Sequence, residues 1–404
     1  MTCNTIRIAP FAVLLLLVAA PGFGQSQIVS RVTLRPTAED RQVTGPDVSV
    51  NFGASVALSG TTAAIGIPHE IQDQPQPFGP GRVGIYTKVQ ADWIRMATLV
   101  PSNPNDTRLG RDVDICGDLV IAAADSSTYV FQRRSGQWSE IKRIGLPSPD
   151  SVLGPVVCSG NAFAQSVSRR DDQGQLVARR VYVYERTRGG NFALVAKLRA
   201  SDPNDSIGRS IAMERGILVA GSEPDAVYIF ARQRGRWIER EKLQSPVAGG
   251  GGFGAAVAIG DRIIIVGAPA VDLPDEFLSD GDAFVYLPHR GTWFESQSLN
   301  APLPELAPSS HFGAKVAMGR RLAAVGVPIT TADEIRPRSV VTVFDRIGAE
   351  FTPLHRGYSA GPDDETIPDF DMSRRRLIVS EHESLRLNGQ IIGRVTIIEF
   401  EPSP

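Results

Sequence analysis

The sequence is poor in the residues and motifs that most metal and catalytic sites require. Among 404 residues there are five histidines and three cysteines, and none of them forms a Cys/His zinc spacing or a His-Glu-x-x-His motif. A Gly-x-Ser-x-Gly nucleophile elbow and a glycine-rich phosphate loop are missing as well. The formal net charge is -2, with no basic stripe, so we expect no nucleic-acid partner. The absence of these catalytic and metal-binding motifs favours a binding protein over an enzyme.

Long apolar runs are also scarce, and the most prominent one lies at the N-terminus. Arg7 precedes an apolar stretch over residues 9–20, which ends in small residues at Gly22 and Gly24. This pattern is typical of a secretory signal peptide, and the stretch is too short to span a bilayer permanently. We therefore expect a signal peptide over residues 1–24 and no membrane span. The remaining residues, 25–404, are predicted to form one domain that is secreted or periplasmic.

Removal of a signal peptide would leave two cysteines in the mature chain. Cys3 would leave with the peptide, while Cys116 and Cys158 fall near the end of the first strand in adjacent repeats. Export would make a disulfide between them chemically possible. The sequence leaves two alternatives open, a disulfide between Cys116 and Cys158 or two buried free thiols.

Glycine and proline are abundant, and they punctuate a repeat. The chain contains 39 glycines and 29 prolines, which favours short strands joined by tight turns. Each repeat opens with a large apolar residue followed by glycine, and successive openings lie 44 to 59 residues apart. The six clear openings are Phe52-Gly53, Leu109-Gly110, Leu153-Gly154, Ile207-Gly208, Phe253-Gly254 and Phe312-Gly313, and a degenerate seventh lies near Ile367. This spacing accommodates four strands per repeat.

The fourth strand of the repeat supplies an independent check. A large apolar residue is followed six positions later by an aliphatic one, so both lie on one face of a strand. All four tryptophans of the chain occupy this position, in the pairs Trp93/Leu99, Trp138/Ile144, Trp237/Leu243 and Trp293/Leu299. The same interval separates Ile28 from Leu34 at the N-terminus, whereas the C-terminal repeat has no fourth strand. We therefore predict an all-β, seven-bladed β-propeller with four-stranded blades, closed by an N-terminal strand that completes the last blade.

Two motifs of the repeat resemble a known family. The Phe-Gly openings and Gly267-Ala268-Pro269 after a second strand resemble FG-GAP repeats, known from the N-terminal β-propeller of integrin α subunits and from exported bacterial proteins. The resemblance implies a secreted, integrin α-like binding or cell-adhesion domain. The family's Ca²⁺ loop is missing, because turns such as Gly260-Asp261-Arg262 are too short to wrap an ion. We therefore expect no cofactor, and only Ca²⁺ is left open.

Long connections between second and third strands identify the candidate binding surface. In a propeller these connections emerge on one face, here called the loop-rich face, together with the connectors between blades. The candidate ligand-binding residues in them are Asp272, Asp275, Glu276, Asp280 and Asp282 in blade five, and Arg169 and Arg170 in blade three. The carboxylates could bind Ca²⁺ or a basic ligand, but a solvated surface loop is the favoured explanation. Two matching connectors, residues 102–106 and 201–205, are predicted to be architectural.

Two functions follow from this pattern. The first is a secreted, non-catalytic adhesion or recognition protein that engages an extracellular or periplasmic protein or glycan through the loop-rich face. The second is a carbohydrate-active enzyme, a polysaccharide lyase or hydrolase, that uses Asp114 and Asp371, which share one register in blades two and seven and are expected to line the central channel. No other catalytic residues and no metal site are predicted.

Overall fold

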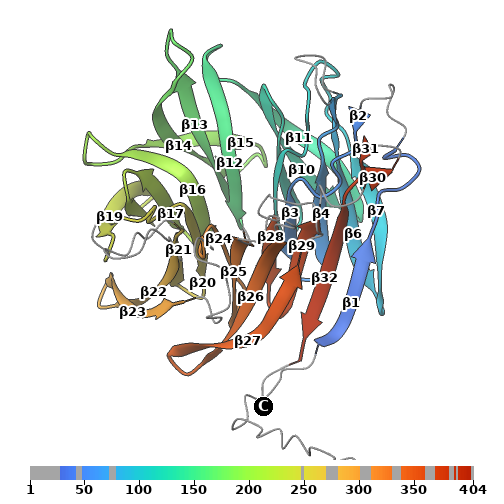
Figure 1. Ribbon diagram of the computed structural model, residues 1–404. Helices are drawn as coiled ribbons and strands as arrows, with labels where there is room; N and C mark the ends of the chain where they lie inside the picture. The colour runs from blue at the N-terminus through green and yellow to red at the C-terminus, as the bar shows by residue number, and fades with distance from the viewer. Residues whose placement is uncertain are drawn as a thin grey trace, which may run out of the picture.

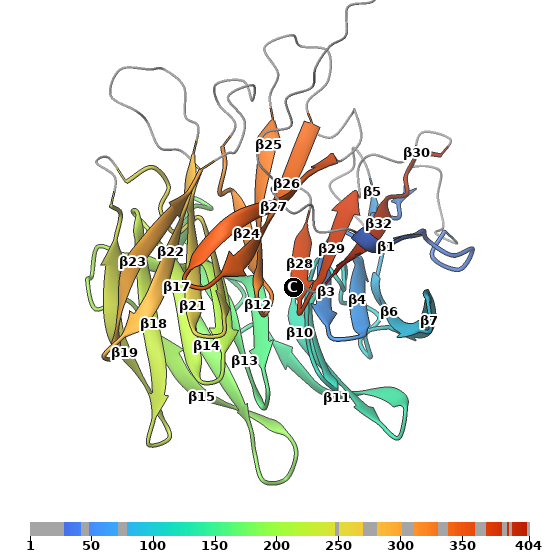
Figure 2. The ribbon, with the colours of Figure 1, turned by 90° about the horizontal axis from the view of Figure 1, so that it is seen from below.

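A computed structural model shows a ring of seven four-stranded antiparallel sheets, which confirms the predicted seven-bladed β-propeller. The structure describes residues 28–41, 48–71, 79–246, 250–269, 281–300, 311–329, 338–359, 369–381, 386–387 and 390–401. The predicted signal peptide lies outside these ranges. Figure 1 shows the blades arranged in a circle, and Figure 2 shows strands of neighbouring blades standing side by side along a common direction. Within the described ranges no helix is long and apolar enough to cross a membrane.

The first four blades follow one another along the chain. Blade 1 contains β3 (Val56–Ser59), β4 (Thr62–Ile67), β6 (Arg82–Val89) and β7 (Asp92–Leu99). Blade 2 contains β8 (Asp112–Cys116), β9 (Leu119–Ala123), β10 (Ser127–Arg134) and β11 (Gln137–Gly145). Blade 3 contains β12 (Ser151–Ser159), β13 (Ala162–Arg170), β14 (Leu176–Arg186) and β15 (Phe192–Leu198). Blade 4 contains β16 (Ser206–Glu214), β17 (Ile217–Glu223), β18 (Ala226–Gln233) and β19 (Arg236–Gln244).

The remaining blades complete the ring. Blade 5 contains β20 (Ala256–Gly260), β21 (Ile263–Ala268), β22 (Asp282–His289) and β23 (Thr292–Leu299). Blade 6 contains β24 (Lys315–Met318), β25 (Leu322–Ile329), β26 (Arg338–Ile347) and β27 (Glu350–Ser359). Blade 7 contains β28 (Phe370–Ser373), β29 (Arg376–Glu381), β32 (Arg394–Phe400) and β1 (Ile28–Leu34). Two further pairs are β2 (Val48–Ser49) with β5 (Glu70–Ile71), and β30 (Arg386–Leu387) with β31 (Gln390–Ile391).

Both ends of the chain meet in blade 7, as the sequence predicts. Strand β1 pairs antiparallel with β32, from Ile28 opposite Phe400 to Leu34 opposite Val395. Figure 1 shows this seam where the blue first strand lies against the red last strand. The order of the sheet is β1-β32-β29-β28, so the N-terminal strand supplies the outer edge of a sheet that the C-terminal part of the chain begins. This pairing closes the ring.

The core consists of layers between successive blades. The second strands β4, β9 and β21 are buried at every residue, because they lie in the middle of a sheet that is covered on both faces by neighbouring blades. Trp93, Trp237 and Trp293 are buried in these layers, and Trp138 packs against one of them while partly exposed. The recurring tryptophan position is therefore a structural one.

Glycine contacts between blades explain the two motifs of the repeat. Gly110, Gly254 and Gly313 follow the opening apolar residue and have φ angles of 93°, 89° and 93°, which favour glycine. Each lies against a glycine in the second strand of the preceding blade: a Cβ at Gly66 would overlap the carbonyl oxygen of Gly110, and Gly221 with Gly254 and Gly267 with Gly313 show the same contact. The opening Phe52, Phe253 and Phe312 are completely buried. Both motifs thus set the spacing between adjacent blades.

Candidate functional site

The innermost strands of the seven blades surround a central cavity of about 470 Å³. Its charged lining includes the carboxylates of Asp112, Asp114, Asp369 and Asp371 and the ammonium group of Lys315. The sequence places Asp114 and Asp371 in this channel, and the structure brings both to its wall. Asp112 lies two positions before Asp114 on β8, and Asp369 lies two positions before Asp371, immediately ahead of β28, so blades 2 and 7 carry the same pair of aspartates.

The aspartates of blade 7 bind the backbone of blade 1. Asp369 Oδ2 accepts a hydrogen bond from the Val56 amide at 2.6 Å, and Asp371 Oδ2 accepts one from the Leu58 amide at 2.7 Å. Strand β3 is the inner edge of its sheet, so alternate amides on it have no partner within the sheet. The carboxylates supply that partner from the neighbouring blade.

The aspartates of blade 2 bind blade 3 in the same manner. Asp112 Oδ2 accepts from the Val156 amide at 2.6 Å, and Asp114 Oδ2 accepts from the Cys158 amide at 2.5 Å. Cys158 also forms a disulfide with Cys116, two residues after Asp114, and the two Cα atoms are 5.9 Å apart. Of the two states that the sequence leaves open for these cysteines, the structure therefore shows the bonded one. Blades 2 and 3 are joined covalently at the channel.

The second carboxylate oxygens are also occupied by backbone amides. Asp114 Oδ1 accepts from the Ile115 amide, and Asp371 Oδ1 accepts from the Met372 amide, both at 2.7 Å. Each carboxylate is thus held by one amide of its own strand and one of the next blade. Asp114 and Asp371 therefore have an architectural role: each holds its own blade to the next one by hydrogen bonds.

Enclosure in the channel shifts the proton affinity of these groups. Burial, together with the nearby Asp371 carboxylate, raises the pKa of Asp114 to about 7. Burial raises the pKa of Asp371 to about 6 and also raises the pKa of Asp112. Burial lowers the pKa of Lys315 in spite of the attraction of the aspartates, and its ammonium group forms an ion pair with Asp369. The carboxyl groups of Asp114 and Asp371 therefore titrate near neutral pH.

The candidate residues of blade five are mostly not placed. Asp272, Asp275, Glu276 and Asp280 lie outside the described residues, so binding of Ca²⁺ or of a basic ligand there stays a prediction. Asp282 is the first residue of β22, and its carbonyl oxygen packs against Gly313 of blade 6. Within the described ranges no group of three or more His, Cys, Asp or Glu side chains has a geometry suitable for a metal ion.

The candidate arginines of blade three lie on an extended hairpin. Strands β13 and β14 remain paired up to Arg170 and Leu176, and Arg169 and Arg170 are exposed. The tip has a defined turn, in which Asp171 Oδ1 accepts the amides of Gln173 and Gln175.

The register of this hairpin reveals a further arginine at the candidate site. Arg180 lies opposite Val167, two residues before Arg169, and its side chain is exposed. A register shift separates this pair from Arg169. Sequence reasoning missed Arg180, because only the register of the pairing reveals it. The neighbouring Arg179 points elsewhere and forms an ion pair with Glu223 of blade 4 at 2.8 Å.

The matching connectors are architectural, as predicted. In the connector before blade 2, Asp106 accepts a hydrogen bond from the Tyr129 hydroxyl and pairs with Arg143 at 2.9 Å. In the connector before blade 4, Asp205 accepts from the Tyr228 hydroxyl at 2.6 Å and pairs with Lys242 at 2.9 Å. Each connector thereby fixes itself to the outer strands of the blade it enters.

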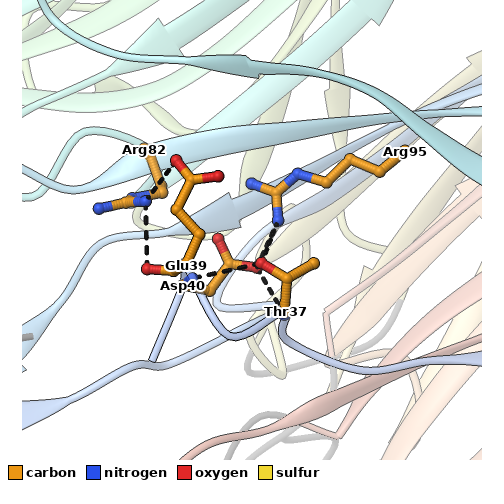
Figure 3. Close-up of polar contacts among 5 residues, drawn as sticks. All are labelled: Thr37, Glu39, Asp40, Arg82 and Arg95. Atoms are coloured by element: carbon orange, nitrogen blue, oxygen red, sulfur yellow. Dashed lines mark hydrogen bonds and ion pairs between the residues drawn. The ribbon is translucent and has the colours of Figure 1, made fainter. Parts of the chain in front are cut away.

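A third connector of this kind escaped the sequence analysis. The segment 35–41 between β1 and blade 1 places Asp40, which is fully buried, against Arg95 of β7. Figure 3 shows Asp40 and Glu39 pointing from this segment toward Arg95 and Arg82. The sequence around Asp40 does not match the other two connectors, so only the structure reveals the equivalence.

Comparison with known proteins identifies the fold. No protein-family model matches the chain, and no curated protein sequence is similar to it. The chain is similar to the β-propeller domain of Cps50 (Swd1) from Myceliophteria thermophila, with a TM-score of 0.55, 11% identity, and coverage of 93% of this chain and 99% of that domain. It is also similar to Sqt1 from Saccharomyces cerevisiae, with a TM-score of 0.49, 10% identity, and coverage of 88% and 97%. At these identities the similarity shows the β-propeller fold alone.

Proposed function

We propose that this chain is a secreted, non-catalytic binding protein that engages an extracellular or periplasmic protein or glycan through its loop-rich face. The observation that carries the proposal is the difference between the two candidate surfaces. In the channel, Asp114 and Asp371 have both oxygens bonded to backbone amides. On the blade-three hairpin, Arg169 and Arg180 extend into solvent from a rigid β-structure.

Two further features support export and recognition. The apolar N-terminal stretch is typical of a signal peptide, and a disulfide between blades 2 and 3 suits an oxidising compartment. The Phe-Gly and Gly-Ala-Pro motifs support kinship with FG-GAP propellers, in which a binding role is common. Exposed arginines on a preorganised hairpin form charge-assisted hydrogen bonds with little loss of conformational entropy.

A capture experiment with a matched control tests this function. Immobilised wild-type protein, the double variant Arg169→Ala/Arg180→Ala and the control Arg188→Ala are exposed to the envelope proteins of the host and to a glycan array. Arg188 is exposed on the β14–β15 turn, at the opposite end of the same blade. We expect a partner that binds the wild type and the control but is lost from the double variant. Equal binding by all three proteins, or no partner for the wild type, would contradict the proposal.

A second candidate function is a carbohydrate-active enzyme that uses the channel. The observation in its favour is that Asp114 and Asp371, with pKa values raised to about 7 and 6, place one protonated and one ionised carboxyl group near each other at neutral pH. Activity of the wild type on a polysaccharide panel that disappears in Asp114→Asn would favour this function. No turnover of any polysaccharide would leave the binding function as the better explanation.

A further inference from the structure

A second polar site lies beneath the N-terminal connector. The strap, residues 35–41, crosses from β1 of blade 7 to blade 1. The strap pocket, which it covers, consists of Asp40, His69, Arg82, Tyr86 and Arg95. Figure 3 shows three of these residues, Asp40, Arg82 and Arg95. The strap has its own helical turn, because Asp40 Oδ2 accepts the Thr37 amide at 2.9 Å and Thr37 Oγ1 accepts the Asp40 amide at 3.3 Å.

Few bonds hold the strap on the blade. Arg95 Nη1 donates to Asp40 Oδ2 and to Thr37 Oγ1, the latter at 3.2 Å, and the exposed Glu39 pairs with Arg82 at 3.2 Å. Burial opposes ionisation of the Asp40 carboxyl, but the hydrogen bonds from Arg95 and Thr37 outweigh it and hold its pKa below the ordinary value. Asp40 is therefore an anion bound to one terminal nitrogen of Arg95.

The pocket concentrates polar atoms that are buried without a partner. Six such atoms belong to its five residues: Asp40 Oδ1, His69 Nε2, Arg82 Nε, Tyr86 Oη, Arg95 Nε and Arg95 Nη2. The Arg95 guanidinium lies 5.9 Å from the centre of the Tyr86 ring and interacts electrostatically with the Tyr86 hydroxyl, without a well-aligned hydrogen bond between them. Buried polar atoms are nearly always paired in folded proteins. This cluster of six unpaired atoms therefore indicates a site that could bind the polar groups of a ligand.

In the equivalent sites of blades 2 and 4, the connector aspartate is paired with polar side chains of the blade. There Asp106 and Asp205 each bind a tyrosine hydroxyl and a cation. That tyrosine is the third residue of β10 and β18, and in blade 1 the third residue of β6 is Gly84. Tyr86 and Arg95 occupy the space beside Gly84, since a Cβ on Gly84 would lie 3.1 Å from the Tyr86 ring. Blade 1 therefore lacks the pairing of a connector aspartate with a tyrosine hydroxyl, and the residues that differ, Tyr86 and Arg95, are those with unpaired atoms.

The unpaired donors have the geometry of an anion receptor. Nε and Nη2 form one edge of the Arg95 guanidinium, the edge that binds both oxygens of a carboxylate in bidentate pairs. The Tyr86 hydroxyl adds a third donor beside it. Asp40 accepts a hydrogen bond from Nη1, so the Nε/Nη2 edge is buried and has no hydrogen-bond acceptor.

We propose that the strap pocket is a binding site for a small organic carboxylate, which competes with Asp40 for the Arg95 guanidinium. A ligand carboxylate would bind the Nε/Nη2 edge of Arg95 and the Tyr86 hydroxyl after the strap lifts and carries the Asp40 carboxylate away. The unpaired atoms make the closed strap less stable than the connectors of blades 2 and 4, which favours its opening. This site is distinct from the blade-three hairpin, and it does not depend on the proposed partner binding.

An acetate titration tests the site directly. The NMR signal of the Arg95 Nε–H group, assigned by its loss in Arg95→Lys, is followed at constant ionic strength in three proteins: the wild type, Asp40→Ala and the control Asp205→Ala. Asp205 is the matched residue, because its removal leaves Lys242 paired with Asp202 at 3.0 Å. We expect Asp40→Ala to bind acetate at least tenfold more tightly than the wild type and the control. Equal affinity in Asp40→Ala and Asp205→Ala would overturn the proposal.

A second measurement uses only the wild type and remains decisive if a variant fails to fold. Amide hydrogen exchange of residues 37–41 is compared with that of the connector residues 102–106. We expect at least tenfold faster exchange in the strap, and a further acceleration when acetate replaces chloride, because acetate binds the open form. Equal protection of the two segments, or no response to acetate, would show that Asp40 is simply an architectural anchor.

Discussion

Replacement of Asp114 by asparagine should make the stability of the propeller depend less on pH. The pKa of the Asp114 carboxyl is about 7 in the folded chain, raised by burial and by Asp371, against an ordinary value of 3.8. Between these values the folded chain binds more protons than the unfolded chain, so the stability of the wild type falls as the pH rises from about 4 to about 7. Asparagine does not ionise and removes this pH-dependent loss, but its amide nitrogen replaces one of the two oxygens that accept backbone amides.

The size of the effect follows from the same two pKa values. The difference between about 7 and 3.8 corresponds to about 4 kcal/mol, which is an upper bound because water in the channel screens the charge and Asp371 titrates together with Asp114. We expect Asp114→Asn to lose stability from the missing acceptor at both pH values, and to gain about 1–3 kcal/mol relative to the wild type between pH 5 and pH 8.

Urea denaturation at pH 5 and pH 8, with the disulfide intact, measures this difference. Asp106→Asn is the matched control, because burial of Asp106 is outweighed by hydrogen bonds from Arg143, Ser126 and Tyr129 that lower its pKa. Its stabilising contribution is present above the ordinary pKa of an aspartate, so this variant should be destabilised at both pH values. If Asp114→Asn were less stable than the wild type at pH 8 by as much as at pH 5, the raised pKa would be wrong.

Three further predictions concern the ring. Reduction of the Cys116–Cys158 disulfide, which closes a loop with a sequence separation of 42 residues, should lower the free energy of unfolding by about 2–4 kcal/mol, measured by urea denaturation with and without reductant. Gly66→Ala should cost about 1–3 kcal/mol, because its Cβ would overlap the Gly110 carbonyl, whereas Gly145→Ala, with open space around it, should be neutral in the same thermal melts. Tyr129→Phe should cost about 1–3 kcal/mol by removing a hydrogen bond to the buried Asp106 carboxylate, and a loss below 0.3 kcal/mol in denaturant titrations would show that the connector is not anchored there.

The sequence predicts the fold because its signals come from positions that recur from blade to blade. The glycine openings and the tryptophan positions reflect contacts between adjacent blades, so the copies reinforce one another. The position of Asp114 and Asp371 on the channel wall follows from the same register. Sequence patterns of this kind are read correctly because each level of structure agrees with the next.

The function of individual side chains was harder to predict, because it depends on register between sheets. Asp112 accepts the Val156 amide because of how blade 2 is aligned with blade 3. No pattern within a single strand predicts this hydrogen bond. The strap pocket was missed because Gly84 stands where the equivalent blades have tyrosine, so the repeat is broken at the residue that would identify it. Departures from a repeat become visible only once the copies are superimposed in space.

The pairing of β1 with β32 sets the order of events during synthesis. Strand β1 is made before any blade exists, but its partner, with Phe400 opposite Ile28, is made only after the strands of blades 1 to 6. Those six blades can assemble one after another on local contacts, whereas blade 7 needs two distant segments to meet, which is the slowest kind of contact to form. A partly folded chain therefore remains an open arc until β32 is available to pair with β1.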